Sequence, residues 1–191
     1  MQIPTPRLQI MALSVVCLTA CGSVQPYPNK SVVHEDSVSA PETLKAAPWA
    51  LSISRDAIAP VFLSEWNQAK NRSNCALLAL SNRSEAHALG AKPRRANFAG
   101  GWAVAYDMPN LRSAYGIAGT GTLANSNNIY TWPHNKQWLD GSRMGYGLEG
   151  GEGPSYLAYL SVTGQSCLYN VWSRLGEEHL LRIINDLRRV D

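Results

Sequence analysis

The chain begins with an apolar run that is too short to cross a membrane as a helix. Residues Leu8–Ala20 carry no charge and are mostly apolar, and Arg7 is the one charged side chain before them. A helix that spans a bilayer needs about 20 apolar residues. A short apolar core that follows a positive start and ends in small residues is typical of an export signal. An exported chain folds in an oxidising compartment, so its fold can include disulfide bonds.

The end of this run, Leu18-Thr19-Ala20-Cys21, resembles the lipobox of bacterial lipoproteins, in which Leu and two small residues precede a cysteine. The resemblance implies that residues 1–20 are removed as a signal peptide. It also implies that Cys21 receives a diacylglycerol and that its new amino group is acylated, for example with palmitate. Two or more acyl chains anchor a protein stably, whereas one binds only marginally. Gly22, where lipoproteins retained in the inner membrane often have Asp, favours the outer membrane with the domain facing the periplasm. The alternative is an ordinary secreted protein that is cut nearby.

The charge of the chain argues against nucleic acid as a partner. There are 17 Lys and Arg against 14 Asp and Glu, and residues 1–20 contain one Arg and no acid, so the mature charge is about +2. The basic residues form no dense stripe, which a nucleic-acid-binding surface requires. No second apolar stretch approaches the length of a membrane span. The predicted contact with the membrane is therefore the lipid on Cys21.

Two cysteines remain after Cys17 has left with the signal peptide and Cys21 has been lipidated. Cys75 and Cys167 are an even pair in an oxidising compartment, and we predict a disulfide between them. In the chain-entropy model a loop of this length contributes roughly 4 kcal/mol to stability. The alternative is two separate buried thiols. No Cys or His pair has the spacing of metal ligands, so we predict no metal and no cofactor.

Composition divides the mature chain into a tether and a domain. Residues 21–48 are rich in Pro, Ser, Val and charge without a sustained period, which is typical of a flexible tether. Residues 49–191 are long enough for one periplasmic globular domain with its own core. Residues 58–70 have a helical period, with Pro60 near their start. Residues 176–190 predict an amphipathic helix, with acidic residues at its beginning and basic residues at its end.

Aromatic and β-branched runs predict the strands of this domain. Residues 155–162 and 166–172 flank Thr163-Gly164-Gln165, which predicts an antiparallel hairpin. The fold class is therefore α+β, with an antiparallel sheet of about five strands and two helices packed on it. The period does not decide whether residues 75–80 form a strand or a helix. Residues 119–154 are expected to be mostly loop, with short extended pieces such as Met144–Leu148. Further strand candidates are 50–54, 97–106 and 113–118, the last two as a second hairpin.

Glu149 and Glu152 lie three residues apart in the Gly-rich stretch 145–154. Two carboxylates on such a permissive backbone can hold Ca²⁺, a basic partner or a glycan hydroxyl. They can serve as a hydrolase pair only with a defined separation and one raised pKa. The alternative is a solvated loop without function.

Two tryptophans, Trp132 and Trp138, are expected to be exposed beside Tyr130 on a polar stretch. Tryptophan and tyrosine present a flat apolar face with a polar tip, which suits sugar stacking and protein interfaces. We therefore predict Trp132 and Trp138 as binding residues, with ordinary packing as the alternative. Trp102 and Trp172 lie in predicted strands and are expected in the core.

No catalytic constellation can be assigned. His87, His134 and His179 each stand alone, and His179 is expected at the surface or at a packing edge of its helix. A Gly-x-Ser-x-Gly elbow is missing from the sequence. We predict a non-catalytic, membrane-anchored periplasmic lipoprotein that binds a protein or a cell-envelope polymer such as peptidoglycan. One version is an immunity or inhibitor protein that neutralises an envelope-attacking toxin. The alternative is a cell-envelope hydrolase that uses Glu149 or Glu152.

Overall fold

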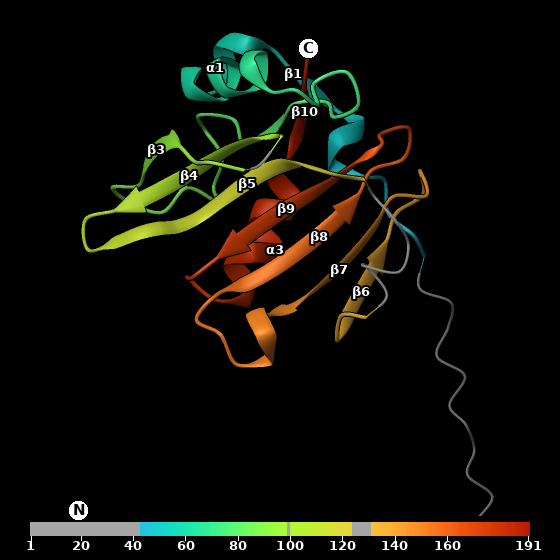
Figure 1. Cartoon of the computed structure of the whole chain (residues 1–191). Coiled ribbons are helices and arrows are strands. Elements are labelled where there is room, and N and C mark those ends of the chain that lie inside the picture. The colour runs from blue at the N-terminus through green and yellow to red at the C-terminus, as the bar shows by residue number, and fades with distance from the viewer. Residues whose placement is uncertain (1–42, 99, 124–130) are drawn as a thin grey trace, which may run out of the picture. The chain divides into compact units, whose positions relative to one another are not determined.

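The computed structural model describes residues 43–98, 100–123 and 131–191. Their largest element is a seven-stranded antiparallel sheet with the strand order β3-β4-β5-β9-β8-β7-β6 (Figure 1). The α+β class and the hairpin at residues 155–172 are confirmed. The strands are β3 (Lys92–Arg95), β4 (Trp102–Met108), β5 (Leu111–Leu123), β6 (His134–Gln137), β7 (Arg143–Leu148), β8 (Tyr156–Ser161) and β9 (Cys167–Ser173).

A second, three-stranded sheet joins both ends of the domain. It consists of β1 (Ser52–Ile53), β2 (Leu78–Ala79) and β10 (Arg188–Val190) in the order β1-β10-β2. β10 pairs parallel with β1 and antiparallel with β2. The prediction that 176–190 is helical throughout is wrong at its end, because the backbone becomes extended at Leu187 and the chain then joins this sheet.

The large sheet has more strands than the five expected from the sequence. The two edge strands, β3 and β6, account for much of the difference. β3 reads Lys-Pro-Arg-Arg and β6 reads His-Asn-Lys-Gln, so neither contains an apolar residue besides proline. Charged residues and proline are the common protection of exposed sheet edges. Such strands lack the apolar alternation that reveals a strand in the sequence.

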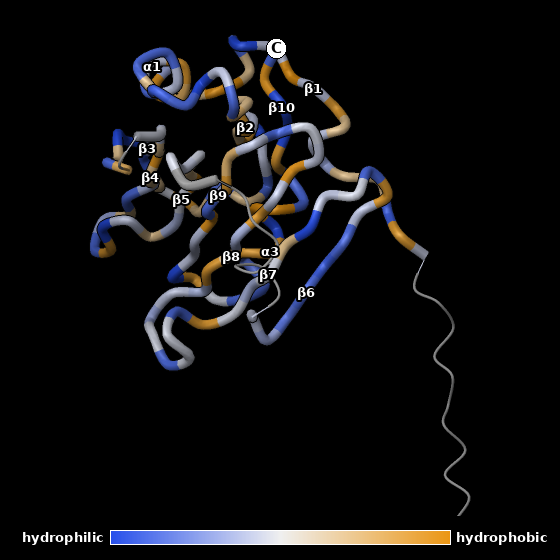
Figure 2. Tube along the Cα trace, turned by 45° about the vertical axis from the view of Figure 1, so that its right-hand side comes forward, coloured by the Kyte–Doolittle hydropathy of each residue, from blue (hydrophilic) through white to orange (hydrophobic). Residues whose placement is uncertain are grey.

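Two α-helices, α1 (Pro60–Gln68) and α3 (Glu177–Asp186), pack on one face of the large sheet. Phe62 of α1 is fully buried against Trp102 and Tyr106 of β4. The apolar stripe of α3 is buried against β8 and β9, as its period predicts. The trace of the edge strand β6, by contrast, is hydrophilic along its length (Figure 2). Three short 3-10 helices lie at η1 (Pro48–Ala50), η2 (Arg55–Ala57) and η3 (Glu149–Gly151).

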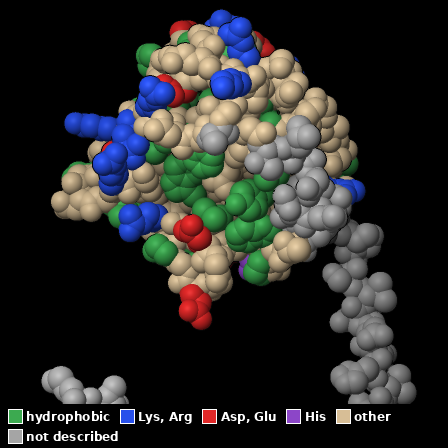
Figure 3. Space-filling view, viewed as in Figure 1, with side chains coloured by type: hydrophobic (Ala, Val, Ile, Leu, Met, Phe, Trp, Pro, Cys, Tyr) green, Lys and Arg blue, Asp and Glu red, His purple; other side chains and the backbone are tan. Residues whose placement is uncertain are grey.

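The opposite face of the large sheet has no helix of the described residues over it (Figure 1). Figure 3 views this face, where hydrophobic side chains gather over the middle of the sheet and Lys and Arg side chains lie to their left. Packing of the domain also extends slightly before Trp49, because Ala47 is buried and the carbonyl of Lys45 accepts a hydrogen bond from the amide of Leu139.

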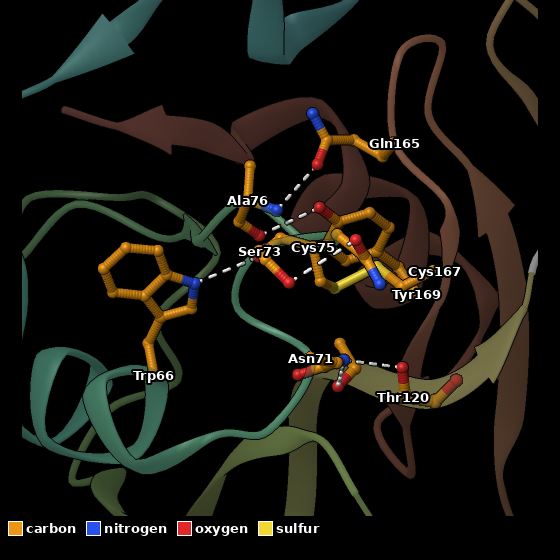
Figure 4. Close-up of a disulfide and its surroundings, with 11 residues drawn as sticks. Trp66, Asn71, Ser73, Cys75, Ala76, Thr120, Gln165, Cys167 and Tyr169 are labelled. Atoms are coloured by element: carbon orange, nitrogen blue, oxygen red, sulfur yellow. Dashed lines mark hydrogen bonds between the residues drawn. A yellow bond between two sulfur atoms is a disulfide. The ribbon is translucent and has the colours of Figure 1, made fainter.

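The predicted disulfide between Cys75 and Cys167 is confirmed (Figure 4). It joins the segment before β2 to the first residue of β9, and both cysteines are buried. Neighbouring hydrogen bonds join the same two regions. The Tyr169 hydroxyl donates to the carbonyl of Ala76 at 2.9 Å, and the Ala76 amide donates to the side chain of Gln165 at 2.8 Å.

His179 is buried on the helix-covered side of the sheet, so its expected place at a surface or packing edge is wrong. It precedes Ile183 by one turn and therefore shares the apolar face of α3. Its Nδ1 lies 2.9 Å from the hydroxyl of Ser173, and its Nε2 lies 2.9 Å from the carbonyl of Ala86. The ring also meets Tyr115 edge-on, with 4.8 Å between centroids. Both ring nitrogens of His179 therefore have hydrogen-bond partners inside the core.

Lowering the pH below about 6.5 is expected to destabilise the domain through His179. Burial lowers the pKa of His179 below its ordinary value of 6.5, and the nearby charges of Arg182 and His87 act in the same direction. The unfolded chain therefore takes up a proton at higher pH than the folded chain. The contribution of this residue to the unfolding free energy is complete above about pH 6.5 and is lost as the pH falls toward the folded-state pKa.

Urea unfolding across this pH range measures the effect. The pH dependence should be smaller in His179→Gln than in His134→Gln, because the ring of His134 is exposed on β6. Equal pH dependence in the two variants would contradict the assignment.

Candidate functional site

The open face of the large sheet contains a hollow with a volume of about 890 Å³. We call it the aromatic groove. It lies over β5, β9, β8 and the start of the segment that leads into β6. Its lining residues are Phe98, Ser113, Thr120, Thr131, Trp132, Glu149, Ser155, Leu157, Tyr159, Leu168, Asn170, Trp172 and Arg174.

Strand register determines how these side chains lie across the groove. Gly116, Trp172, Leu157 and Gly147 are neighbours in one row across four strands. A Cβ at Gly116 would overlap the ring of Trp172, and a Cβ at Gly147 would approach Trp132 to 3.3 Å. The missing side chains at the two glycines therefore let two indole rings lie close to the sheet.

Paired rings lie on the β5 side and on the β7 side of the groove. On the β5 side, Phe98 stacks on Trp172 with 6.0 Å between ring centroids. The Trp172 indole also donates a hydrogen bond to the carbonyl of Ser113 at 3.3 Å. On the β7 side, Trp132 meets Tyr159 edge-on at 5.4 Å. Ring surfaces fixed in this way offer flat apolar contact to a ligand.

Asn170 lies in the next row of the same face, between Ala118 of β5 and Tyr159 of β8. It is 7 % exposed and lines the groove. Its polar atoms are not among the fully buried ones that lack a partner, which in the described residues are Asn71 Oδ1 and Trp102 Nε1. Asn170 contributes amide donors and an amide acceptor to the floor of the groove.

A second hollow of about 710 Å³ adjoins the groove and shares Phe98, Ser113 and Trp172 with it. Its other lining residues include Arg94, Arg95 and Arg112. We call this region the arginine hollow. Figure 3 shows the basic side chains beside the apolar centre of the face. The two hollows together form one surface with an aromatic and a basic part.

The arginines of this region differ in how firmly they are held. Arg94 donates to Asp107 at 2.7 Å and to the Ser113 hydroxyl at 2.6 Å. The hydrogen bond from Arg94 holds the pKa of Asp107 below its usual value. Arg174, which lines the groove, donates to the carbonyl of Arg112 at 3.3 Å. No ion pair involves Arg112 or Arg174 in the described part of the chain, so both cations can meet an anionic ligand.

Two of the four predicted binding residues, Trp132 and Glu149, lie in the aromatic groove. Trp138 is 1 % exposed and packs edge-on against Trp49 at 4.8 Å, so the expectation that it is exposed is wrong. The polar residues before Trp138 belong to the edge strand β6, and its own ring turns into the core. Glu152 is exposed and does not line the groove. Tyr130 and Cys21 lie outside the described residues.

The residues that sequence reasoning missed are on the outward side of strands. Trp102 is fully buried as expected, but Trp172 is only partly buried and lines the groove, so its placement in the core is wrong. Leu168, Asn170 and Trp172 alternate along β9 with core residues, which is the period of one strand face. The sequence does hold one sign that this face of β9 lies outside the core: the polar residue Asn170 stands on it between Leu168 and Trp172.

The carboxylates of the aromatic groove bear on the predicted alternative, a hydrolase. Glu149 is its one carboxylate among the described lining residues, whereas glycoside hydrolysis commonly uses two. The Ser173–His179 pair is buried on the other side of the sheet and cannot meet a substrate in the groove.

Neither a metal site nor a membrane span is found in the described residues. In residues 43–98, 100–123 and 131–191, no group of three or more His, Cys, Asp or Glu side chains could hold a metal ion. None of the helices described there has the length and apolar character needed to cross a bilayer.

Comparisons with protein-family models, with curated proteins and with solved structures found no match to this chain.

Proposed function

We propose that the protein is a lipid-anchored, non-catalytic binding protein of the periplasm that holds a sugar-containing, acidic polymer of the cell envelope. Peptidoglycan is the polymer that fits this description. The proposal depends on one observation: the open sheet face carries a groove of about 890 Å³ with aromatic rings on two sides, continuous with an arginine-lined hollow.

The aromatic part of the surface supports a ligand with sugar rings, whose apolar faces can stack on aromatic side chains. Trp132, Tyr159 and Phe98 present ring surfaces that are held by neighbouring rings. Small-ligand sites commonly have volumes of about 300–1,000 Å³ and a few polar groups among apolar ones. A folded protein partner typically covers about 800 Å² of surface, and the groove suits a narrower occupant. These features favour a polymer over a toxin or another globular partner.

The basic part of the surface supports an acidic ligand. Arg112 and Arg174 have no ion pair in the described residues, and Arg94 is fixed nearby by Asp107. Carboxylates are the acidic groups of peptidoglycan, and an arginine fork binds a carboxylate through two parallel hydrogen bonds. The lipobox Leu18–Cys21 supports the compartment, since a lipid at Cys21 would hold the domain within reach of this polymer.

Co-sedimentation with purified peptidoglycan sacculi tests the proposal. The full-length lipoprotein in detergent is expected to sediment with sacculi. The Arg112→Glu/Arg174→Glu variant should bind at least about tenfold more weakly, because each lost charge-assisted contact is replaced by repulsion. The matched control is Arg72→Glu/Arg182→Glu, which makes the same charge change away from the groove and should bind like the wild type. Equal binding of the two double variants, or no sedimentation of the wild type, would refute the proposal.

A further inference from the structure

We propose that the aromatic groove and the arginine hollow together select a sugar that carries its acidic group close to the ring. This inference rests on the proposed function and specifies which acidic group of peptidoglycan the surface takes. That group is the lactyl carboxylate of N-acetylmuramic acid, which a short ether joins to the sugar. The argument starts from the residues that line both hollows, Phe98, Ser113 and Trp172.

The backbone of Ser113 is unusual for a residue with a side chain. Its φ of 52° is the one positive φ of a residue other than glycine among the described residues. Such a conformation is uncommon and persists where surrounding contacts hold it. The amide of Ser113 donates to Asp107 at 2.7 Å, and its hydroxyl accepts from Arg94 at 2.6 Å. Its carbonyl accepts from the indole of Trp172 at 3.3 Å, so the turn is fixed by three hydrogen bonds.

Two successive carbonyls of this turn hold a cation and a ring from the neighbouring strand. The carbonyl of Arg112 accepts from the guanidinium of Arg174 at 3.3 Å. The next carbonyl, that of Ser113, accepts from the indole of Trp172 at the same distance. Successive residues of a chain lie about 3.8 Å apart. The left-handed turn at Ser113 therefore holds a positive charge directly beside an aromatic ring.

The positive charge that is free of a carboxylate lies at this turn. Arg94 is paired with Asp107 at 2.7 Å, and Arg95 is paired with Glu65 at 3.3 Å. Arg112, which belongs to the turn, has no ion pair in the part of the chain that the structure describes. An acidic group is therefore attracted to the turn, next to the ring that the turn holds.

A short, fixed spacing between ring and cation selects among the carboxylates of peptidoglycan. Most of them lie on the peptide, many bonds away from the sugar. The lactyl carboxylate lies only a few bonds from its own sugar ring. It can meet an arginine fork while that sugar stacks on Trp172.

This choice of ligand implies a preceding reaction. In the intact polymer an amide bond joins the lactyl carboxyl group to the peptide. The reaction that supplies the ligand is therefore hydrolysis of this amide, in which water frees the lactyl carboxylate and the amino group of the peptide. We infer that the surface favours glycan strands from which the peptide has been removed.

Calorimetry with three tetrasaccharides tests the inference on the full-length lipoprotein in detergent. The first alternates N-acetylglucosamine with N-acetylmuramic acid and has free lactyl carboxylates. The second has L-alanine on each lactyl group, which keeps the charge but moves it one residue further from the sugar. The third is the neutral tetramer of N-acetylglucosamine. The wild type should bind the first at least about tenfold more tightly than either of the others, because a hydrogen bond to a charged group contributes this factor or more.

Two variants of Ser113 test the spacing. Ser113→Gly adopts the left-handed φ without strain and keeps both carbonyls, so it should retain the preference for the first tetrasaccharide. Ser113→Val disfavours this φ because its side chain is β-branched, and it should lose the preference. It should still bind the neutral tetramer like the wild type, since Phe98 remains stacked on Trp172.

A change of charge serves if Ser113→Val does not fold. Arg112→Gln/Arg174→Gln should bind the first tetrasaccharide no more tightly than the neutral one. The matched control, Arg72→Gln/Arg182→Gln, makes the same change away from the groove and should retain the preference.

The possible failures can be told apart. Equal affinity of the wild type for the first two tetrasaccharides, or a preference that survives in Arg112→Gln/Arg174→Gln, would overturn the inference. So would a wild type that sediments with sacculi but binds none of the three tetrasaccharides. In each of these cases binding to sacculi continues to support the proposed function. A wild type that does not bind sacculi would end the proposed function itself.

Discussion

Replacing both cysteines of the disulfide by alanine is expected to lower the free energy of unfolding by about 4 kcal/mol. The bond joins residues 92 apart in the sequence, so it removes many open conformations from the unfolded chain. It also ties the segment before β2 to β9, where the Tyr169–Ala76 and Ala76–Gln165 hydrogen bonds lie. Urea unfolding followed by tryptophan fluorescence measures the loss in the Cys75→Ala/Cys167→Ala variant.

A reducing agent provides the control for this prediction. The reduced wild type should unfold close to the double variant, and the double variant should be indifferent to the reducing agent. Two free thiols in the native protein, or equal unfolding free energies for wild type and double variant, would show that the prediction is wrong.

Replacing Cys21 by alanine is expected to abolish lipidation and the removal of residues 1–20 together. The mature wild type should begin at Cys21 and carry acyl chains, and it should fractionate with membranes. Each buried methylene contributes about 0.8 kcal/mol, so two or more chains hold the protein on the membrane. Intact mass spectrometry should find the uncut, unlipidated precursor in Cys21→Ala. Exchanging residues 1–21 for an ordinary cleavable signal should move the protein to the soluble periplasmic fraction.

Cys17→Ala is the matched control, because this cysteine lies in the peptide whose removal is predicted. It should leave the mass of the mature lipoprotein and its membrane fractionation unchanged. An unmodified thiol at Cys21, or an intact Met1 in the native protein, would contradict the anchor.

The parts of the fold that could be predicted are those with a local signal. The Gly164 turn between two aromatic runs predicts the β8–β9 hairpin, and Pro60 marks the start of α1. The polar strands β3 and β6 could not be found, because their pairing depends on neighbours far away in the sequence. The helical pattern of the sequence continues beyond the end of α3, because the pairing of β10 with β1 overrides it.

The site was predictable only in part, for the same reason. Trp132 and Trp138 stand in similar polar surroundings, yet Trp132 lies in the groove and Trp138 packs on Trp49 from the other end of the domain. A contact between residues so distant in sequence leaves no local pattern. The environment of Asn170 likewise depends on β5 and β8, which flank its strand in the sheet.

The central position of β10 in the small sheet has a consequence for biogenesis. β1 and β2 have no common partner until Arg188–Val190, which follow every other strand in the chain, become available. A nascent chain that lacks this segment cannot close the sheet, whatever has formed upstream. The small sheet therefore closes only after every strand of the large sheet has been synthesised.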